Sequence, residues 1–160
     1  QDLALLSRSL RQVPSPDRPR SPRPRRLTNA ARLVEVAHVD QRSFGPPWGL
    51  DVVGVVDACR ATPRFRLRVI GQHRAIVGYA ITGEAGTNAY LQRLAVDPAT
   101  QGRGFGRSLT IDALRWAQGR RCTTMLVNTH TGNVPALSLY RSLGFEELRY
   151  RLVVMERRLG

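Results

Sequence analysis

Hydrophobic and polar residues recur with two different periods along this chain, and these periods predict helices in some segments and strands in others. Residues 29–44 and 50–61 carry apolar residues at helical spacing, and the rigid turn FGPPWG separates them. A strand pattern, rich in β-branched and other apolar residues, recurs in four segments: 64–70, 75–83, 89–96 and 123–129. The mixture of elements predicts a domain of the α/β class.

The first 26 residues are organised differently. Leu3, Leu6, Leu10 and Val13 fall on one helical face and predict a short helix within residues 1–13. Residues 14–26 hold five prolines and little to bury, so they predict a linker or extended segment. We therefore expect an Arg/Pro-rich extension over residues 1–26, partly disordered, and a folded domain over residues 27–160.

The net charge is unusual, at a formal +13, and every basic residue is an arginine. Eight of these arginines lie in residues 1–32, against two acidic residues. Such a segment can attract RNA, the ribosome or another anionic surface, or it can simply form a solvated tail. No apolar run approaches the ~18 residues of a membrane helix, so we expect no membrane contact. Two cysteines without ligand-like spacing predict neither a metal site nor a disulfide, which fits the cytoplasm.

The segment VDPATQGRGFGRSL, residues 96–109, places glycines at alternate positions between a strand and a helix. The helix is predicted by four apolar residues on one face: Leu109, Ala113, Trp116 and Ala117. Main-chain N–H groups converge at such a helix start, and the helix dipole favours negative charge there. The loop therefore predicts an anion site, although glycines that allow close helix packing would explain the same composition.

Two familiar phosphate loops do not match this segment. The P-loop requires a lysine, and the chain has none. The dinucleotide-binding fingerprint requires a third glycine where Arg107 stands, and an acidic residue at the end of the next strand, where there is none.

The residues around the loop resemble a different family. Residues 101–106, QGRGFG, are similar to the Q/R-x-x-G-x-G/A acetyl-CoA signature of the GNAT superfamily of N-acetyltransferases. Residues 133–145, NVPALSLYRSLGF, resemble the N-x-x-A-x-x-L-Y-x-x-x-G-F segment of the same superfamily. The resemblance covers residues 27–160. It implies a mixed, twisted sheet of six to seven strands, flanked by helices, with a splayed strand pair that holds acetyl-CoA.

The resemblance also implies which residues hold the cofactor. Backbone near Leu94 and Val96 would pair with the pantetheine arm, and the loop amides would bind the pyrophosphate. The implied cofactor-binding residues are Leu94, Ala95, Val96, Gln101, Gly102, Arg103, Gly104, Phe105, Gly106, Arg107, Asn133, Ala136 and Tyr140. Tyr140 would serve as the general acid for the departing thiolate, although core packing alone would also explain a tyrosine there. Asn133 is a plausible helix N-cap with or without a cofactor contact.

The general base is harder to assign from the sequence. Relatives carry a glutamate at positions that match Gln92 or Asn128, and neither residue here is basic. An imidazole ordinarily titrates near neutral pH, so His130 is our candidate catalytic base, although a histidine in such a loop is often only a surface residue. Glu84 acting through water, or an amine that arrives neutral, are the alternatives.

The acceptor is predicted from the turn between the first two helices. Phe44 to Gly49, FGPPWG, resembles the F-x-x-P-W turn of the ribosomal-protein alanine N-acetyltransferases. The expected substrate-binding residues are therefore Phe44, Trp48, Gln92 and Asn128, although Phe44 and Trp48 could instead pack the two helices together.

The expected function is acetyl transfer from acetyl-CoA to a primary amine, with a protein N-terminus as one acceptor, by a monomer or homodimer that needs no metal. The alternatives are acetylation of a small-molecule amine, non-catalytic acetyl-CoA binding and nucleic-acid binding.

Overall fold

The computed structural model describes residues 2–16 and 22–153. Its strands are β1 (Asp2–Ser9), β2 (Arg25–Arg26), β3 (Arg64–Gln72), β4 (Ala75–Ala85), β5 (Asn88–Val96), β6 (Thr124–His130) and β7 (Glu146–Val153). Its α-helices are α1 (Leu33–Phe44), α2 (Val52–Cys59), α3 (Phe105–Gly119) and α4 (Val134–Ser142), with short 3₁₀ turns η1 (Ala30–Arg32) and η2 (Pro98–Thr100). No helix in this part of the chain is long and apolar enough to cross a membrane.

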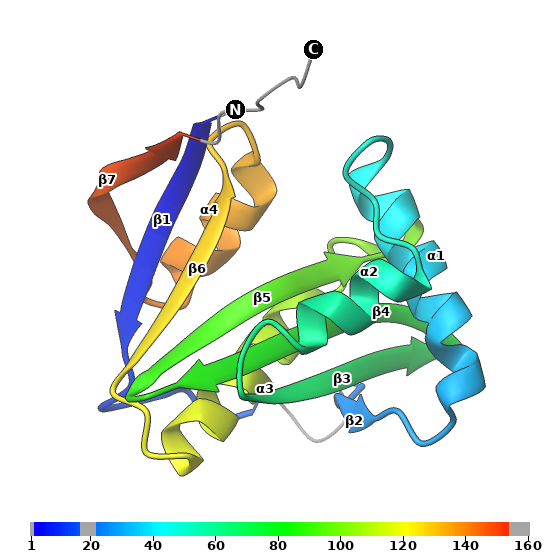
Figure 1. The fold of residues 1–160 in the computed structure, drawn as a ribbon, viewed down its shortest axis with the longest axis horizontal. Coiled ribbons are helices and arrows are strands. Elements are labelled where there is room, and N and C mark those ends of the chain that lie inside the picture. Colours follow the sequence, from blue (N-terminus) through cyan, green and yellow to red (C-terminus); the bar gives the residue numbers. More distant parts are fainter. Residues whose placement is uncertain (1, 17–21, 154–160) are drawn as a thin grey trace.

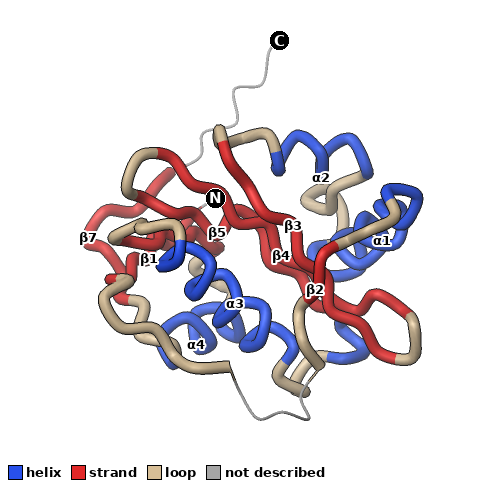
Figure 2. Tube along the Cα trace, turned by 90° about the horizontal axis from the view of Figure 1, so that it is seen from below, coloured by secondary structure: helices blue, strands red, loops and turns tan. Residues whose placement is uncertain are grey.

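One mixed sheet runs in the order β2-β3-β4-β5-β6-β1-β7 (Figure 1). Helices α1 and α2 cover one face, and α3 and α4 cover the other (Figure 2). The central strand β4 serves both layers, because Tyr79 and Ile81 pack toward α1 while Val77 and Ala80 pack toward α3. A strand buried on both faces needs a continuous apolar run, and β4 has one.

Most elements expected from the sequence are confirmed. The α/β class, the strand number and the flanking helices agree with the prediction. The helix expected over residues 29–44 is observed as η1 followed by α1, and the four expected strands are β3 to β6. Asn133 caps α4 by accepting a hydrogen bond from the Ala136 amide, 3.3 Å away. Gly144 follows the helix with a φ of 87°, which favours glycine.

The helix predicted within residues 1–13 is wrong, because residues 2–9 form strand β1. Ala4, Leu6 and Leu10 are buried in the main core, which gives a period of two rather than the helical period we read. β1 pairs antiparallel with β6 on one side and β7 on the other. Two strand edges thus offer hydrogen bonds to the segment, and this tertiary pairing overrides the local pattern.

The boundary expected after residue 26 therefore does not set β1 apart from the sheet. Among the described residues between β1 and α1, regular structure is limited to Arg25 and Arg26, which pair with β3, and to the turn η1. Residues 17–21 of the Arg/Pro-rich segment lie outside the described residues.

Strands β5 and β6 begin side by side and then diverge (Figure 1). They pair in parallel from Asn88 with Thr124 to Tyr90 with Leu126, and no later pairing joins them in the described part of the chain. Between β4 and β5 the register shifts, since Thr82 faces Leu91 and Ile81 faces Arg93. Gln92 is therefore the extra residue of a β-bulge, which bends β5 where the two strands separate.

Candidate active site

The glycine loop adopts a backbone that other residues rarely take. Gly102 has a φ of 82° and Gly104 a φ of 84°, both in the left-handed region. A Cβ atom added at either glycine would meet no heavy atom within 4 Å. The loop therefore needs glycine for its conformation, and its surface is open at both positions.

Helix α3 begins at this loop without a side-chain cap. Gly104 is the N-cap residue, and the first bond of the helix runs from the Ser108 amide to the Gly104 carbonyl at 3.0 Å. By helix geometry, the amides of Phe105 and Gly106 have no carbonyl of the same helix to reach. The Phe105 side chain is buried, and Gly106 packs close to Leu139 of α4. Open amides at a positive helix end suit a phosphate-bearing cofactor.

The polar side chains of the loop turn back toward the protein. The Gln101 side-chain amide donates to the Val96 carbonyl at 3.2 Å, and the Arg103 guanidinium donates to the Gln72 side chain at 3.2 Å. Arg107 lies on the first turn of α3 and is half-buried. Gln101 and Arg103 remain exposed while they make these hydrogen bonds.

The edge of β5 that faces β6 lies beside the loop and has no strand beside it after Tyr90 in the described structure. Leu94, Ala95 and Val96 pair with β4 on the other edge. Half of the main-chain groups of a strand point to each edge, so this stretch of β5 offers donors and acceptors to an extended ligand. Both the predicted loop and the predicted strand residues therefore offer main-chain hydrogen-bonding groups to a ligand.

Tyr140 lies on α4, which begins next to the end of β6. Its side chain is only 4% exposed and packs on Phe145, with ring centroids 5.5 Å apart. No hydrogen bond to its hydroxyl is found among the described residues. Burial raises the pKa of the Tyr140 phenol well above its ordinary value, so the group keeps its proton at physiological pH.

His130 and Trp48 come together from distant parts of the chain. Trp48 lies in the turn between α1 and α2, and its ring centroid is 5.6 Å from that of His130, the last residue of β6. Trp48 remains 39% exposed. Two of the predicted site residues therefore meet at the end where β5 and β6 are apart.

The other predicted residues are less closely joined. Gln92 is half-buried at the bulge, and Asn128 is exposed on β6; no hydrogen bond connects either of them to His130 in the described part. Glu84 lies beside the end where β5 and β6 are paired, and it accepts from Arg120 at 2.7 Å. The Arg120 hydrogen bond lowers the pKa of Glu84, so this carboxylate serves an ion pair and is a poor base.

Sequence reasoning missed an ionic cluster beneath the Trp48 turn. Asp40 of α1 is fully buried and binds Arg93 of β5, whose guanidinium also lies 3.6 Å above the ring of Phe44. One sequence signal was available, because Asp40 falls on the same helical face as Val36 and Val39 and would be buried with them.

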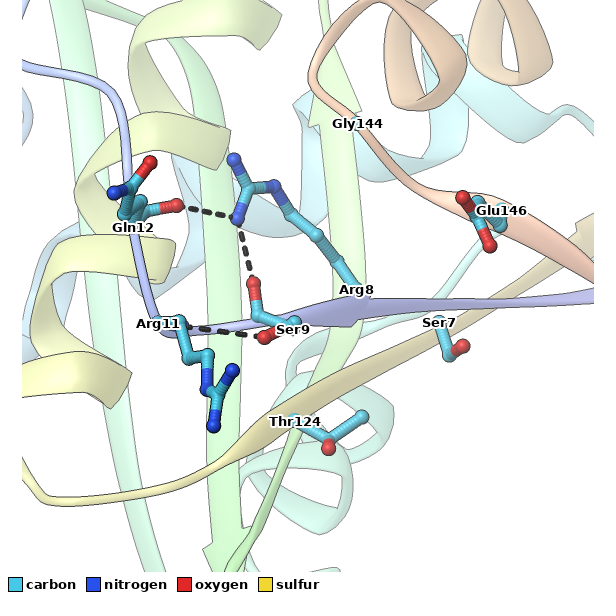
Figure 3. Close-up of a pocket in the computed structure, with 8 residues that line it drawn as sticks. All are labelled: Ser7, Arg8, Ser9, Arg11, Gln12, Thr124, Gly144 and Glu146. Atoms are coloured by element: carbon cyan, nitrogen blue, oxygen red, sulfur yellow. Dashed lines mark hydrogen bonds between the residues drawn. The ribbon is translucent and has the colours of Figure 1, made fainter.

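An open pocket of about 690 Å³ beside β1 contains none of the predicted residues (Figure 3). Arg8 lines it but is occupied by main-chain carbonyls, with Nε 2.6 Å from the Leu143 oxygen and Nη1 bound to the Ser9 and Gln12 oxygens. Arg8 thereby ties β1 to the end of α4, the helix that carries Tyr140.

The chain is similar in sequence to proteins of a known family. Residues 33–145 match the model of the Acetyltransferase (GNAT) family. The chain is 30% identical over 119 residues to the [Ribosomal protein bS18]-alanine N-acetyltransferase of Escherichia coli K12, covering 74% of this chain and 78% of that protein. It is 28% identical over 176 residues to the mycothiol acetyltransferase of Mycobacterium marinum, covering 91% of this chain but only 53% of that protein.

Solved structures show the same fold. The crystal structure of the ribosomal-protein-S18-alanine N-acetyltransferase from Escherichia coli superposes with a TM-score of 0.70 at 25% identity, over 80% of this chain and 79% of that one. An N-acetyltransferase from Thermoplasma acidophilum in complex with coenzyme A has a TM-score of 0.67 at 14% identity, over 79% of this chain and 90% of that one.

The chain therefore belongs to the GNAT acetyltransferase family. It is an N-acetyltransferase that uses acetyl-CoA, as the resemblance implied, and an enzyme rather than a non-catalytic binding protein.

Proposed function

We propose that this enzyme acetylates the α-amino group of a polypeptide. The observation that carries the proposal is the contact between Trp48 and His130 at the open end of the diverging strands. The Trp48 carbonyl accepts from Arg93 of β5 at 2.9 Å, while its ring touches His130 of β6. The turn therefore bridges from one strand to the other and provides an aromatic wall for a peptide. The 30% identity to a relative named for a ribosomal protein alanine supports this choice.

The roles of the reacting groups follow from their surroundings. Acetyl-CoA, when bound, supplies an acetyl group activated as a thioester. The backbone amides at the start of α3 bind its diphosphate, with Gly102 and Gly104 leaving space, and the open edge of β5 from Leu94 to Val96 binds its arm. Asn133 and Ala136 form the first turn of α4 beside this surface.

Proton transfer is assigned to two side chains. Tyr140 holds its proton at the phenolic oxygen, and with no partner for that O–H in the described structure it can donate to a leaving thiolate. His130 accepts the proton that the amine must lose, at an imidazole nitrogen. Gln92 and Asn128 line the same opening as polar, uncharged residues that orient the acceptor.

A small-molecule amine is the second candidate acceptor. The specific observation is the similarity to the mycothiol acetyltransferase, which spans 91% of this chain at 28% identity. A polypeptide remains our choice because the other relative is matched over most of its length as well as most of this chain.

An acceptor screen tests the proposal. Purified enzyme and acetyl-CoA are mixed with hexapeptides of varied first residue and with small amines, thiol release is followed, and mass spectrometry locates the acetyl group. We expect turnover on peptides at the α-amino group. Turnover with small amines alone would contradict the peptide assignment.

Two single-residue variants test whether Trp48 belongs to the acceptor site. Trp48→Ala is expected to raise the peptide KM while leaving the affinity for coenzyme A unchanged. Phe65→Ala is the matched control, because Phe65 is also an exposed aromatic residue but lies on β3, away from the Trp48 turn. Equal effects of the two variants would remove Trp48 from the acceptor site.

We also propose that the enzyme acts in the cytoplasm as a monomer or homodimer. Both cysteines are free and buried, which fits a reducing compartment.

We further propose that the arginines before α1 contact RNA near the acceptor. Arg11, Arg23, Arg25 and Arg26 are exposed. Binding to a ribosomal RNA fragment should weaken steeply with salt, because each phosphate contact releases a counterion. Binding that is unchanged after these four arginines become glutamines would contradict the RNA contact.

A further inference from the structure

The buried carboxylate of Asp40 accepts hydrogen bonds from two strands, β4 and β5, and from the turn between α1 and α2. Its Oδ2 accepts from the Arg93 Nε at 2.8 Å and from the Tyr79 hydroxyl at 2.5 Å. Its Oδ1 accepts from the Arg93 Nη2 at 2.8 Å and from the Leu50 amide at 2.7 Å. A fully buried ion pair is maintained only when its remaining hydrogen-bonding capacity is met, as it is here.

The same cluster holds the turn between α1 and α2 at several points. Arg93 donates to the Trp48 carbonyl at 2.9 Å and covers the Phe44 ring, while Asp40 accepts from the Leu50 amide. The turn also closes on itself, since the Trp48 amide donates to the Gly45 carbonyl at 2.9 Å. One ion pair therefore reaches the start, the middle and the end of the turn.

Trp48 is the residue that this turn presents to His130. Trp48 is exposed, and its side chain makes no hydrogen bond within the described residues, so its position depends on the backbone that carries it and on the His130 ring. Arg93 is also the residue next to Gln92, at the bulge where β5 and β6 begin to separate. The ion pair thus joins the bulge of β5 to the aromatic wall on the far side of the opening.

We propose that Asp40 and Arg93 are positioning residues for the acceptor: their ion pair holds the Trp48 ring against His130 and so shapes the side of the site that receives the amine. This inference rests on the proposed function, in which the Trp48–His130 opening takes the acceptor. It assigns no role in cofactor binding to either residue. It also excludes Asp40 as a base or as a counter-ion for the amine, because the carboxylate is fully buried and already paired.

The test uses the fluorescence of Trp48 in a variant that has no other tryptophan. The chain has two tryptophans, so Trp116→Phe leaves Trp48 as the only one. In that background, Arg93→Met is expected to lower the fluorescence anisotropy of Trp48 and increase its quenching by acrylamide. With the best peptide of the acceptor screen, KM is expected to rise about tenfold, while the Kd of coenzyme A by calorimetry stays within about twofold.

Arg32→Met is the matched control. Arg32 makes the same kind of contact, with Nε 2.7 Å and Nη2 3.0 Å from the two Glu35 oxygens and Nη2 2.8 Å from the Arg74 carbonyl. It lies before α1 and does not touch the turn. We expect Trp48 fluorescence and peptide KM to be unchanged in this variant.

A milder variant covers the case in which Arg93→Met leaves Asp40 unpaired and the chain does not fold. Arg93→Lys keeps the positive charge but cannot donate in parallel to both Asp40 oxygens and also reach the Trp48 carbonyl. It should loosen Trp48 by fluorescence at unchanged coenzyme A affinity. A Trp48 signal that stays rigid in the folded Arg93 variants, or that loosens equally in Arg32→Met, overturns the proposal.

The proposed function and the positioning role of the Asp40–Arg93 pair can be contradicted independently of each other. If no peptide is accepted, the fluorescence of Trp48 still tests the positioning role without any substrate. If Trp48 loosens while peptide KM is unchanged, the ion pair is structural only, and the proposed acceptor site loses its aromatic wall.

Discussion

Gly104→Ala separates the conformational role of the glycine loop from its binding role. Gly104 has a φ of 84°, and in the left-handed region an L-residue is less stable by about 1–2 kcal/mol. No steric cost is added, because a Cβ at this position meets no heavy atom within 4 Å. The free energy of unfolding should therefore fall by about 1–2 kcal/mol, and Tm by about 2–8 °C for a domain of this size.

Cofactor affinity should fall by more than this strain explains. The methyl group would stand on the open surface of the loop, beside amides that we assign to the diphosphate. We expect the Kd of coenzyme A to rise at least about tenfold, or about 1.4 kcal/mol, when measured by calorimetry well below Tm on protein that is fully folded.

Gly119→Ala is the matched control on the same helix. Gly119 is the last residue of α3, its φ is not left-handed, and it also has open space around its Cβ position. Alanine there should raise stability by up to about 1 kcal/mol and leave coenzyme A affinity unchanged. A Gly104→Ala protein that loses stability but binds coenzyme A like Gly119→Ala would refute the assignment of the loop.

Three further predictions concern other parts of the molecule. Tyr140→Phe should lower kcat about 100-fold or more with no change in the Kd of coenzyme A, and unaltered turnover would end the general-acid role. Leu6→Ala should lower the free energy of unfolding by about 2–5 kcal/mol in urea, because Leu6 is fully buried in β1, whereas a flexible tail would show no change. Glu84→Gln should make stability less sensitive to acid. The pKa of Glu84 is lowered by Arg120, so the pair stabilises the fold above the ordinary carboxyl pKa of about 4.3 and is lost as pH falls through the lower folded value. Parallel melting curves at about pH 6 and pH 3 check this, and an equal loss in both proteins would contradict it.

The order in which the strands lie could not be predicted from the chain. β1 is the first strand in sequence, yet it lies between β6 and β7 near the opposite end of the chain. Leu3 and Leu6 of β1 and Leu10 just after it have a spacing that fits a helix, while the same apolar residues also suit a strand. The choice between helix and strand depends on the edges of β6 and β7, which lie more than a hundred residues further along the chain.

The candidate site also has parts that the local sequence predicts and a part that it does not. The glycine loop, the N-cap at Asn133 and Tyr140 were predictable, because backbone conformation, helix capping and helical periodicity are properties of a few neighbouring residues. The contact between Trp48 and His130 was not, although each residue was singled out separately.

The sequence by itself determined the local pieces of this protein: where α3 and α4 begin, which loop requires glycine, and which family the motifs resemble. Only the tertiary structure decided that residues 2–9 complete the sheet, that Asp40 and Arg93 meet under the turn, and that Trp48 reaches His130. The physical reason is the distance along the chain over which each kind of interaction acts. Turn and capping preferences act within about one helical turn, whereas strand pairing and buried ion pairs depend on groups that only folding brings together.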